Sequence, residues 1–200
     1  MNNNILIRID FQNDFVHPDG VLSICNMSLI AAHQKFAQQL SANSFAQIIE
    51  TYDTHFAETY HETIEAQSYP PHCLFGRWGW LQAAPFDSAL NVSKLYKSTT
   101  NLWNEAVQYK LLNADWCTKN VYICGLLSDV CVQQAMDGFL KRCAHVIILE
   151  DLCQGLRRQI NDIIKDDCYL PYLSSGHLQS ITSSRFLSQA SLYHKDTKQS

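Results

Sequence analysis

Short apolar runs alternate along the chain with segments of helical periodicity. Four runs have the composition of strands and end beside a polar residue or a glycine: Ile5-Leu-Ile-Arg-Ile9 before Asp10, Phe45-Ala-Gln-Ile-Ile49 before Asp53, Leu90 to Tyr96 before Lys97, and Val121-Tyr-Ile-Cys124 before Gly125. Between them, residues 28–40 and 130–142 carry apolar side chains at helical spacing. The pattern predicts alternating strands and helices.

The rest of the chain continues this alternation. A fifth strand is predicted over residues 145–149, a helix over 157–173 with its C-cap at Gly176, and a last strand over 179–182. Such an order favours a three-layer α/β/α fold with a six-stranded, mainly parallel sheet. Ligands of open parallel sheets bind beyond the carboxyl ends of the strands, where Asp10, Asp53, Lys97 and Cys131 are expected to gather.

Composition and charge narrow the function classes. With 200 residues and 46% of them hydrophobic, the chain is expected to form one domain over residues 1–200, with loose ends at about 1–4 and 189–200. The net charge of -4 is scattered in both signs, which argues against nucleic-acid and membrane partners and favours a small-molecule substrate. The sequence does not decide whether the chain forms a homo-oligomer.

The cellular location follows from what the pattern lacks. No apolar stretch reaches the roughly 20 residues that cross a bilayer, and the amino terminus does not read as a signal peptide, so we expect a cytoplasmic protein. In that compartment the eight cysteines are expected to be reduced thiols, most of them small buried hydrophobic residues.

Cys131 is the cysteine whose position suggests reactivity. It follows the strand-to-helix turn Gly125-Leu-Leu-Ser-Asp129, so we expect it in the first turn of a helix with Ser128 or Asp129 as the N-cap. Unpaired backbone N–H groups and a nearby Lys97 ammonium would favour the thiolate and lower the pKa of the thiol. The alternative is an inert buried cysteine, a common state of free thiols.

A second set of residues has the chemistry of metal ligands. Asp53 and His55 lie at a strand end where both side chains point the same way, His61 follows, and His72 lies in a stiff segment after two prolines. One aspartate and three histidines suit Zn²⁺ first, with Mn²⁺ or Fe²⁺ as alternatives. Singly, each histidine would more often be a surface or hydrogen-bonded residue. Other residues within chain reach leave one member of the set open: Glu58, Glu62 and Cys73.

Together these motifs resemble the nicotinamidases, the metal-binding branch of the isochorismatase-like cysteine hydrolases. Asp10-Phe-Gln-Asn-Asp-Phe15 is similar to the opening motif of that family, Lys97 to its lysine, and Cys124 to Val132 to its nucleophile turn. Asp53-Thr-His55, His61 and His72 are similar to its metal motifs, and Asp151 fits a structural aspartate. The resemblance spans about residues 5–184 and supports the six-stranded fold.

The resemblance implies an activity. Asp10, Lys97 and Cys131 would form a catalytic triad that hydrolyses nicotinamide to nicotinate and ammonia through a thioester, in NAD salvage. The N–H groups of Leu127 and Cys131 would form the oxyanion hole, beside a cis peptide between Leu126 and Leu127. The metal would bind the pyridine nitrogen, and Phe15 and Tyr69 would flank the ring. For these two aromatic residues the alternative is ordinary core packing.

Several positions depart from the family pattern. Residues 76–80, Gly-Arg-Trp-Gly-Trp, replace a segment close to Gly-Thr-Pro-Gly-Ala, so Arg77 and Trp78 could reshape the pocket. Arg77 either forms a surface ion pair or reaches the crevice and selects an acidic substrate. Leu127 replaces an alanine, and Tyr69 a tryptophan. Lys94 is a rival to Lys97, which we prefer because it lies nearer the carboxyl end of its strand.

Two other functions remain open. The first is hydrolysis of another small amide, carbamoyl compound or vinyl ether by the same fold. The second is a non-enzymatic, ligand-binding member of the fold, which would have no reason to keep base, lysine and nucleophile together.

Overall fold

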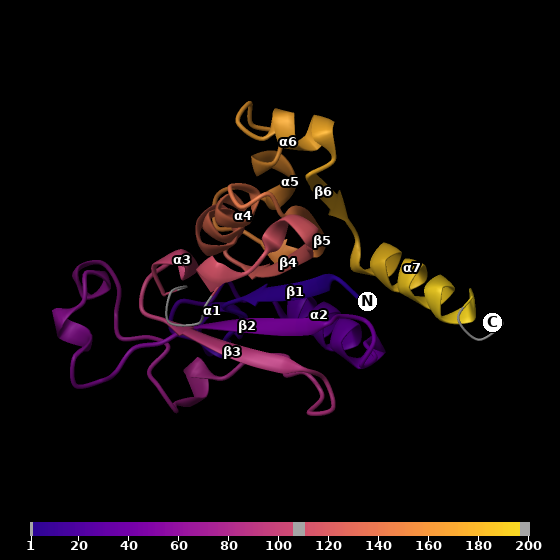
Figure 1. Cartoon of the computed structure of the whole chain (residues 1–200). Helices are drawn as coiled ribbons and strands as arrows, with labels where there is room; N and C mark the ends of the chain where they lie inside the picture. Colours follow the sequence, from indigo (N-terminus) through magenta and orange to yellow (C-terminus); the bar gives the residue numbers. More distant parts are fainter. Residues whose placement is uncertain (1, 106–110, 197–200) are drawn as a thin grey trace.

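A parallel sheet forms the centre of the computed structural model, which describes residues 2–105 and 111–196 (Figure 1). Its six strands lie in the order β3-β2-β1-β4-β5-β6, and all neighbouring strands are parallel. The strands are β1 (Asn4–Ile9), β2 (Gln47–Asp53), β3 (Val92–Lys97), β4 (Asn120–Leu126), β5 (His145–Gln154) and β6 (Leu178–Ile181). The six-stranded, three-layer α/β fold predicted from the sequence is confirmed.

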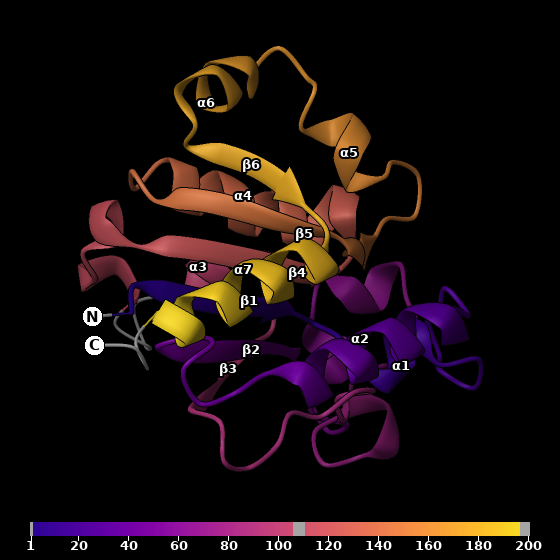
Figure 2. The same ribbon diagram turned by 90° about the vertical axis from the view of Figure 1, so that its right-hand side faces the viewer.

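Helices cover both faces of this sheet (Figures 1 and 2). The α-helices are α1 (Asn13–Val16), α2 (Met27–Gln39), α3 (Leu102–Glu105), α4 (Gln133–Leu140), α5 (Ile160–Ile163), α6 (Leu170–Ser175) and α7 (Ser183–Asp196). Short 3-10 turns are η1 (Tyr60–Glu62), η2 (Glu65–Gln67), η3 (Trp78–Trp80), η4 (Leu111–Asn113) and η5 (Trp116–Thr118), and η6 (Ser128–Val132) is a π-helical turn.

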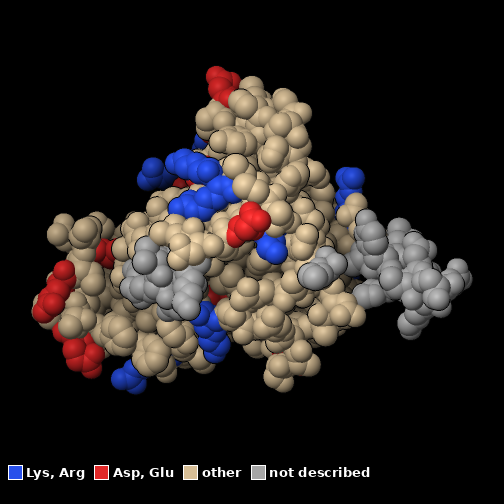
Figure 3. Space-filling model, in the orientation of Figure 1, with Lys and Arg blue, Asp and Glu red and all other residues tan. Residues whose placement is uncertain are grey.

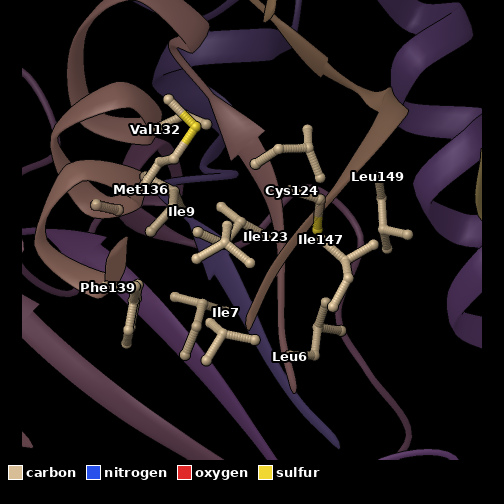
Figure 4. Close-up of a cluster of buried hydrophobic side chains, with 14 of the residues drawn as sticks. Leu6, Ile7, Ile9, Ile123, Cys124, Val132, Met136, Phe139, Ile147 and Leu149 are labelled. Carbon is tan, nitrogen blue, oxygen red and sulfur yellow. The ribbon is translucent and has the colours of Figure 1, made fainter. Parts of the chain in front are cut away.

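The core follows from the alternation of side chains along the central strands. Ile7, Ile9 and Ile123 point toward Met136 and Phe139 of α4 on one face (Figure 4). On the other face lie Leu6, Cys124 and Leu149, and there Phe36 of α2 meets Phe186 of α7 with ring centroids 6.1 Å apart. Because β1 and β4 are buried on both faces, their sequences are almost continuously apolar.

One predicted helix is wrong in extent. Instead of a single helix over residues 157–173, the structure has α5 and α6 with a non-helical segment between them. Pro171 lies in the first turn of α6, where its missing N–H group costs nothing, whereas within a longer helix it would break the hydrogen-bond ladder. The C-cap at Gly176 is confirmed, with a φ of 79° and an N–H bond to Leu173 O.

The described residues near the carboxyl terminus are helical. Residues 189–196, expected to be loose, continue α7, while residues 1 and 197–200 lie outside the described residues. None of the helices in the described part of the chain is long and apolar enough to cross a membrane. The cytoplasmic location and the homo-oligomer stay predictions.

Candidate active site and metal site

Asp10 and Lys97 meet at the carboxyl end of the sheet. Asp10 directly follows β1 and Lys97 is the last residue of β3; both side chains are buried, and Lys97 Nζ lies 2.6 Å from Asp10 Oδ2. Thr51 of β2 donates from its hydroxyl to Asp10 Oδ1 at 2.6 Å and accepts from Asp10 N at 3.0 Å. These contacts hold the carboxylate in one orientation.

Cys131 completes this group from the other side of β1. It lies in the turn η6 after β4, where the charges of Lys97, Asp10 and Asp53 act on its thiol. Gly125 allows the approach of β4 to β1, because its φ is 117° and a Cβ there would lie 2.1 Å from Ile9 O. The expected cis peptide is present between Leu126 and Leu127. The strand ends thus bring Asp10, Lys97 and Cys131 together.

The electrostatics differ from the expectation of a resting thiolate. Burial raises the pKa of the Cys131 thiol, although the Lys97 ammonium opposes the shift. Burial also raises the pKa of Asp10, again against Lys97. Burial alone would lower the pKa of Lys97, but Asp10, Cys131 and Asp53 together outweigh it and the pKa is raised. The prediction of a lowered thiol pKa is therefore wrong, and the thiol needs a base before it can attack.

The expected N-cap is also wrong. Neither Ser128 nor Asp129 caps η6. The Asp129 carboxylate instead accepts backbone hydrogen bonds from Leu156, Arg157 and Arg158 at 3.0, 2.8 and 3.1 Å. Burial would raise the pKa of Asp129, but these three donors lower it. Asp129 ties the thiol turn to the loop before α5.

Next to the triad, four side chains point ligand atoms at one another. Asp53, His55, Glu65 and His72 each offer one atom, and all four atoms lie within 4.8 Å of one another. Asp53 Oδ2 lies 3.1 Å from His55 Nε2 and 3.2 Å from His72 Nε2, while Glu65 Oε2 lies 3.2 and 3.4 Å from the same nitrogens. Asp53 Oδ1 lies 3.9 Å from Lys97 Nζ. Asp53 therefore belongs to both groups.

The structure brings Glu65 rather than His61 to this group. The side chain of His61 is 74% exposed and its ring lies against Glu62, with Nε2 3.7 Å from Oε1. His61 lies in the short turn η1, which directs it outward, whereas η2 turns Glu65 inward. Nothing in the local sequence pattern marked Glu65, since one glutamate in an irregular loop carries no periodic signal.

The four residues fit a divalent cation. Two imidazoles and two carboxylates are a donor set that suits Zn²⁺, Mn²⁺ or Fe²⁺. Burial would lower the pKa of each imidazole, but hydrogen bonds to Asp53 and Glu65 raise it, to about 9 for His55 and about 10 for His72. Burial would raise the pKa of Asp53, but Lys97 and the imidazoles lower it. Two carboxylates thus face two imidazoles that hold protons, and a cation would take the place of those protons.

Gln12 holds Asp53 in place, a role that sequence reasoning missed. Its side chain accepts from Asp53 N at 2.8 Å and donates to Asp53 O at 2.8 Å and to Trp80 O at 3.0 Å. Its position within the motif Asp10 to Phe15 was the one available signal, a polar residue among residues at a strand end.

The predicted ring slot is formed only loosely. Phe15 is half-buried, with its ring centroid 5.7 Å from that of His72, whereas Tyr69 is 52% exposed with its centroid 6.3 Å from His72. Lys94 lies over the Tyr52 ring at 5.5 Å, away from the Asp10 pair. Arg77 is exposed and forms no ion pair among the described residues. Trp78 meets His17 edge-on, with centroids 5.0 Å apart.

Figure 3 shows where charge gathers on one face of the molecule. Acidic side chains lie over the loop that follows β2, which protrudes at the left and includes the exposed Glu58 and Glu62. Lysine and arginine side chains on this face form separate small groups rather than a stripe.

The family model for the isochorismatase domain matches residues 4–162 of this chain. No curated protein matches the sequence. Among solved structures, pyrazinamidase of Pyrococcus horikoshii in complex with zinc is similar with a TM-score of 0.66 and 19% identity, over 90% of this chain and 99% of that chain.

Two further structures share the fold. PnC1 from L. infantum in complex with nicotinate gives a TM-score of 0.64 and 24% identity, over 92% of this chain and 94% of that chain. N-carbamoylsarcosine amidase from Thermoplasma acidophilum gives 0.62 and 18%, over 90% and 96%. At such identities the likeness concerns the fold.

Proposed function

The chain belongs to the isochorismatase family, and from this premise we propose that it is a metal-dependent nicotinamidase, which converts nicotinamide to nicotinate and ammonia in NAD salvage. One observation carries the proposal: Asp53 lies 3.9 Å from Lys97 and also contacts both imidazoles of the four-residue cluster. A thiol, its base and a cation-binding group therefore lie side by side, as hydrolysis of an amide on a metal-binding ring requires.

The first half of the reaction uses the triad. Asp10, whose pKa is raised by burial, accepts the proton of the Cys131 thiol, and the sulfur attacks the amide carbonyl carbon. Lys97 balances the negative charge of the pair at 2.6 Å from Asp10. The backbone N–H groups of Leu127 and Cys131 hold the oxyanion. Asp10 returns the proton to the leaving nitrogen, the C–N bond breaks, and ammonia leaves a thioester.

The second half uses the same base. Asp10 takes a proton from a water molecule, the resulting hydroxide attacks the thioester carbonyl, and the C–S bond breaks. The thiol regains the proton from Asp10 and nicotinate is released. The base thus serves each half in turn.

Asp53, His55, Glu65 and His72 would hold one divalent ion, with Zn²⁺ the first expectation. When bound, the ion supplies a coordination position for the pyridine nitrogen and so fixes the orientation of the ring. Phe15 is half-buried beside His72, and Tyr69 lies on the more exposed side of the same imidazole. In the proposed complex, Phe15 packs against the pyridine ring of the substrate and Tyr69 flanks that ring.

The chief rival is hydrolysis of another small amide or a carbamoyl compound. It is favoured by one observation: residues 76–80 carry Arg77, an exposed cation without an ion pair in the described part of the chain, near the loop that bears His72. An acidic substrate would suit such a cation. A purely ligand-binding protein would gain nothing from the buried Asp10–Lys97 pair beside a thiol.

The test measures ammonia and nicotinate released from nicotinamide by zinc-loaded protein. Cys131→Ala is expected to lower kcat by at least about 1,000-fold, because the nucleophile is lost. Cys25→Ala, at an exposed thiol outside the triad, is the control and should keep full activity. Turnover of a carbamoyl or acidic amide but not of nicotinamide would favour the rival, and substantial activity in folded Cys131→Ala would contradict the mechanism.

A further inference from the structure

Two exposed cysteines, Cys117 and Cys143, lie in the segments that lead into β4 and β5, at the amino ends of these strands and away from the triad at the carboxyl ends. Cys117 belongs to η5, just before β4, and Cys143 lies in the turn between α4 and β5. Strands β4 and β5 pair in parallel with Asn120 opposite His145, and Lys119 O accepts from His145 N at 3.1 Å. The segments that enter these two strands therefore run side by side.

The Cys117 thiol reaches the peptide that carries Cys143. Cys117 Sγ donates to Arg142 O at 3.6 Å, the carbonyl directly before Cys143, and the proximity of the Cys143 thiol raises the pKa of Cys117. Cys143 has a φ of 60° and its N–H bonds to Leu140 O at 3.1 Å, which fixes the turn that presents its thiol. The other exposed cysteines are Cys25 and Cys168.

We propose that Cys117 and Cys143 form a modification site, a surface dithiol that small disulfides such as glutathione disulfide oxidise to an intramolecular disulfide. Both thiols are exposed, so an oxidant reaches them without unfolding, and neighbouring strands hold them in place. Lys141, exposed beside them, favours the approach of an anionic disulfide.

The exchange proceeds in two steps. Cys143 attacks one sulfur of glutathione disulfide, forming a mixed disulfide and releasing one glutathione. Cys117 then attacks the Cys143 sulfur, the protein disulfide forms, and a second glutathione leaves. The protein dithiol loses two electrons and two protons, and glutathione disulfide takes them up. Cys143 is the first nucleophile because the Cys117 thiol is engaged with Arg142 O at 3.6 Å, and the neighbouring Cys143 raises the pKa of Cys117.

The link would enclose a functional part of the chain. Residues between Cys117 and Cys143 include β4, the turn with Cys131, and α4. A disulfide across this segment restricts the unfolded chain, so it should raise the melting temperature by about 5 °C or more. Because the pair lies at the amino ends of the strands, it leaves the residues at the carboxyl ends unchanged.

The test exposes the reduced full-length protein to glutathione buffers of increasing oxidised fraction. Peptide mapping without reductant is expected to find a Cys117–Cys143 cross-link, with the intact mass lower by two hydrogen atoms, in wild type and in Cys25→Ser. Cys117→Ser should stop at a mixed disulfide on Cys143. Both single serine variants are surface changes and should lose the rise in melting temperature.

Two results would overturn the proposal. One is the absence of the cross-link in fully oxidised buffer. The other is glutathione attached separately to Cys117 and Cys143 at the same rate as to Cys25 and Cys168. Neither result depends on whether nicotinamide is hydrolysed, so this site stands or falls apart from the proposed activity.

Discussion

At the residue scale, Gln12 has more influence on the metal group than its position outside that group suggests. Its amide closes two hydrogen bonds with the backbone of Asp53, both 2.8 Å long, so the aspartate backbone is fixed on either side of its Cα. Groups that orient a ligand typically change metal affinity by about 10–100-fold when they are lost.

Gln12→Ala is therefore expected to weaken zinc binding by about tenfold or more, as measured by competition with a chromogenic chelator. The exposed Gln34→Ala on α2 serves as the matched control and should leave affinity unchanged. Unaltered affinity in a folded Gln12→Ala protein would show that Asp53 needs no such support.

Some residues of the candidate site could be predicted from the sequence and others could not. Asp10, Lys97, Asp53 and Cys131 could be placed because each lies at or after the recognisable carboxyl end of a strand. Glu65 could not be predicted, because it reaches His55 through irregular turns whose path depends on tertiary packing. His61 was predicted in its place from residue type and chain distance, but its side chain in η1 points outward.

The direction of the pKa shift of the Cys131 thiol could not be predicted from the sequence either. Proximity to Lys97 was predictable, but the desolvation that outweighs it depends on how closely β4 and η6 pack onto the sheet.

At the element scale, the segment 76–80 supports the candidate metal site through the contact of Gly79 with Asp14. Asp14 Oδ2 accepts from Cys73 N at 2.7 Å, next to His72, and a Cβ on Gly79 would lie 2.2 Å from the Asp14 carboxylate. Although residues 76–80 depart from the family pattern, they therefore keep a glycine at position 79, where any side chain would displace Asp14.

Gly79→Ala should destabilise the fold by about 1–3 kcal/mol in urea unfolding, because overpacking forces Asp14 away from Cys73. Zinc affinity should fall with it, since His72 follows the displaced backbone. Gly76→Asn is the control: its position has open space and a φ of 74° that asparagine tolerates. Equal effects of both variants would rule out the steric account.

Asp129 joins two elements, the thiol turn η6 and the loop before α5, and its pKa is lowered by three backbone donors. A carboxylate with a lowered folded pKa adds stability that is complete above its ordinary value of about 3.9 and is lost as the pH falls through the folded value. Asp129→Asn should therefore lower the free energy of unfolding at pH 7 by about 1–2 kcal/mol.

The difference between wild type and Asp129→Asn should narrow as the pH drops below about 4, in urea titrations at a series of pH values. Asp167→Asn, at an exposed carboxylate, should show neither effect. A constant difference across this range would mean that the charge of Asp129 is not what the loop binds.

Element boundaries were predicted less well than element types. Strand positions were recognisable from apolar runs, yet β2 and β5 extend beyond them because pairing with their neighbours continues past the apolar residues. The π-helical form of η6 had no sequence signal. The periodicity of residues 157–173 predicted one continuous helix, which is wrong, although Pro171 within the segment indicates a helix break.

At the scale of the whole molecule, metal binding should couple to global stability. The four residues that could hold an ion come from the end of β2 and from the irregular loop up to His72, so a bound ion would join segments that the unfolded chain does not hold together. Removing zinc with a chelator should lower the melting temperature by about 5–10 °C, the shift expected when the free ion exceeds its dissociation constant about 100-fold.

Calorimetry with and without chelator measures this shift. Zinc added back in excess should restore the original melting temperature. Cys131→Ala should show the same shift, because the thiol is outside the ligand set, whereas His72→Ala should show little. An identical melting temperature in all states would exclude a structural contribution of the ion.

The overall topology was within reach of the sequence because alternating strands and helices permit few arrangements. Right-handed crossovers and buried parallel strands leave little choice once the strands are located.

The triad draws its lysine from an edge of the sheet. Asp10 and Cys131 follow the central strands β1 and β4, but Lys97 ends β3, an edge strand with a partner on one side only. Edge elements open at a lower free energy than the core, as native-state hydrogen exchange reports. A population of molecules can thus be folded yet catalytically silent, with base and thiol in place and the lysine withdrawn. Heat inactivation of the enzyme would then precede its cooperative melting.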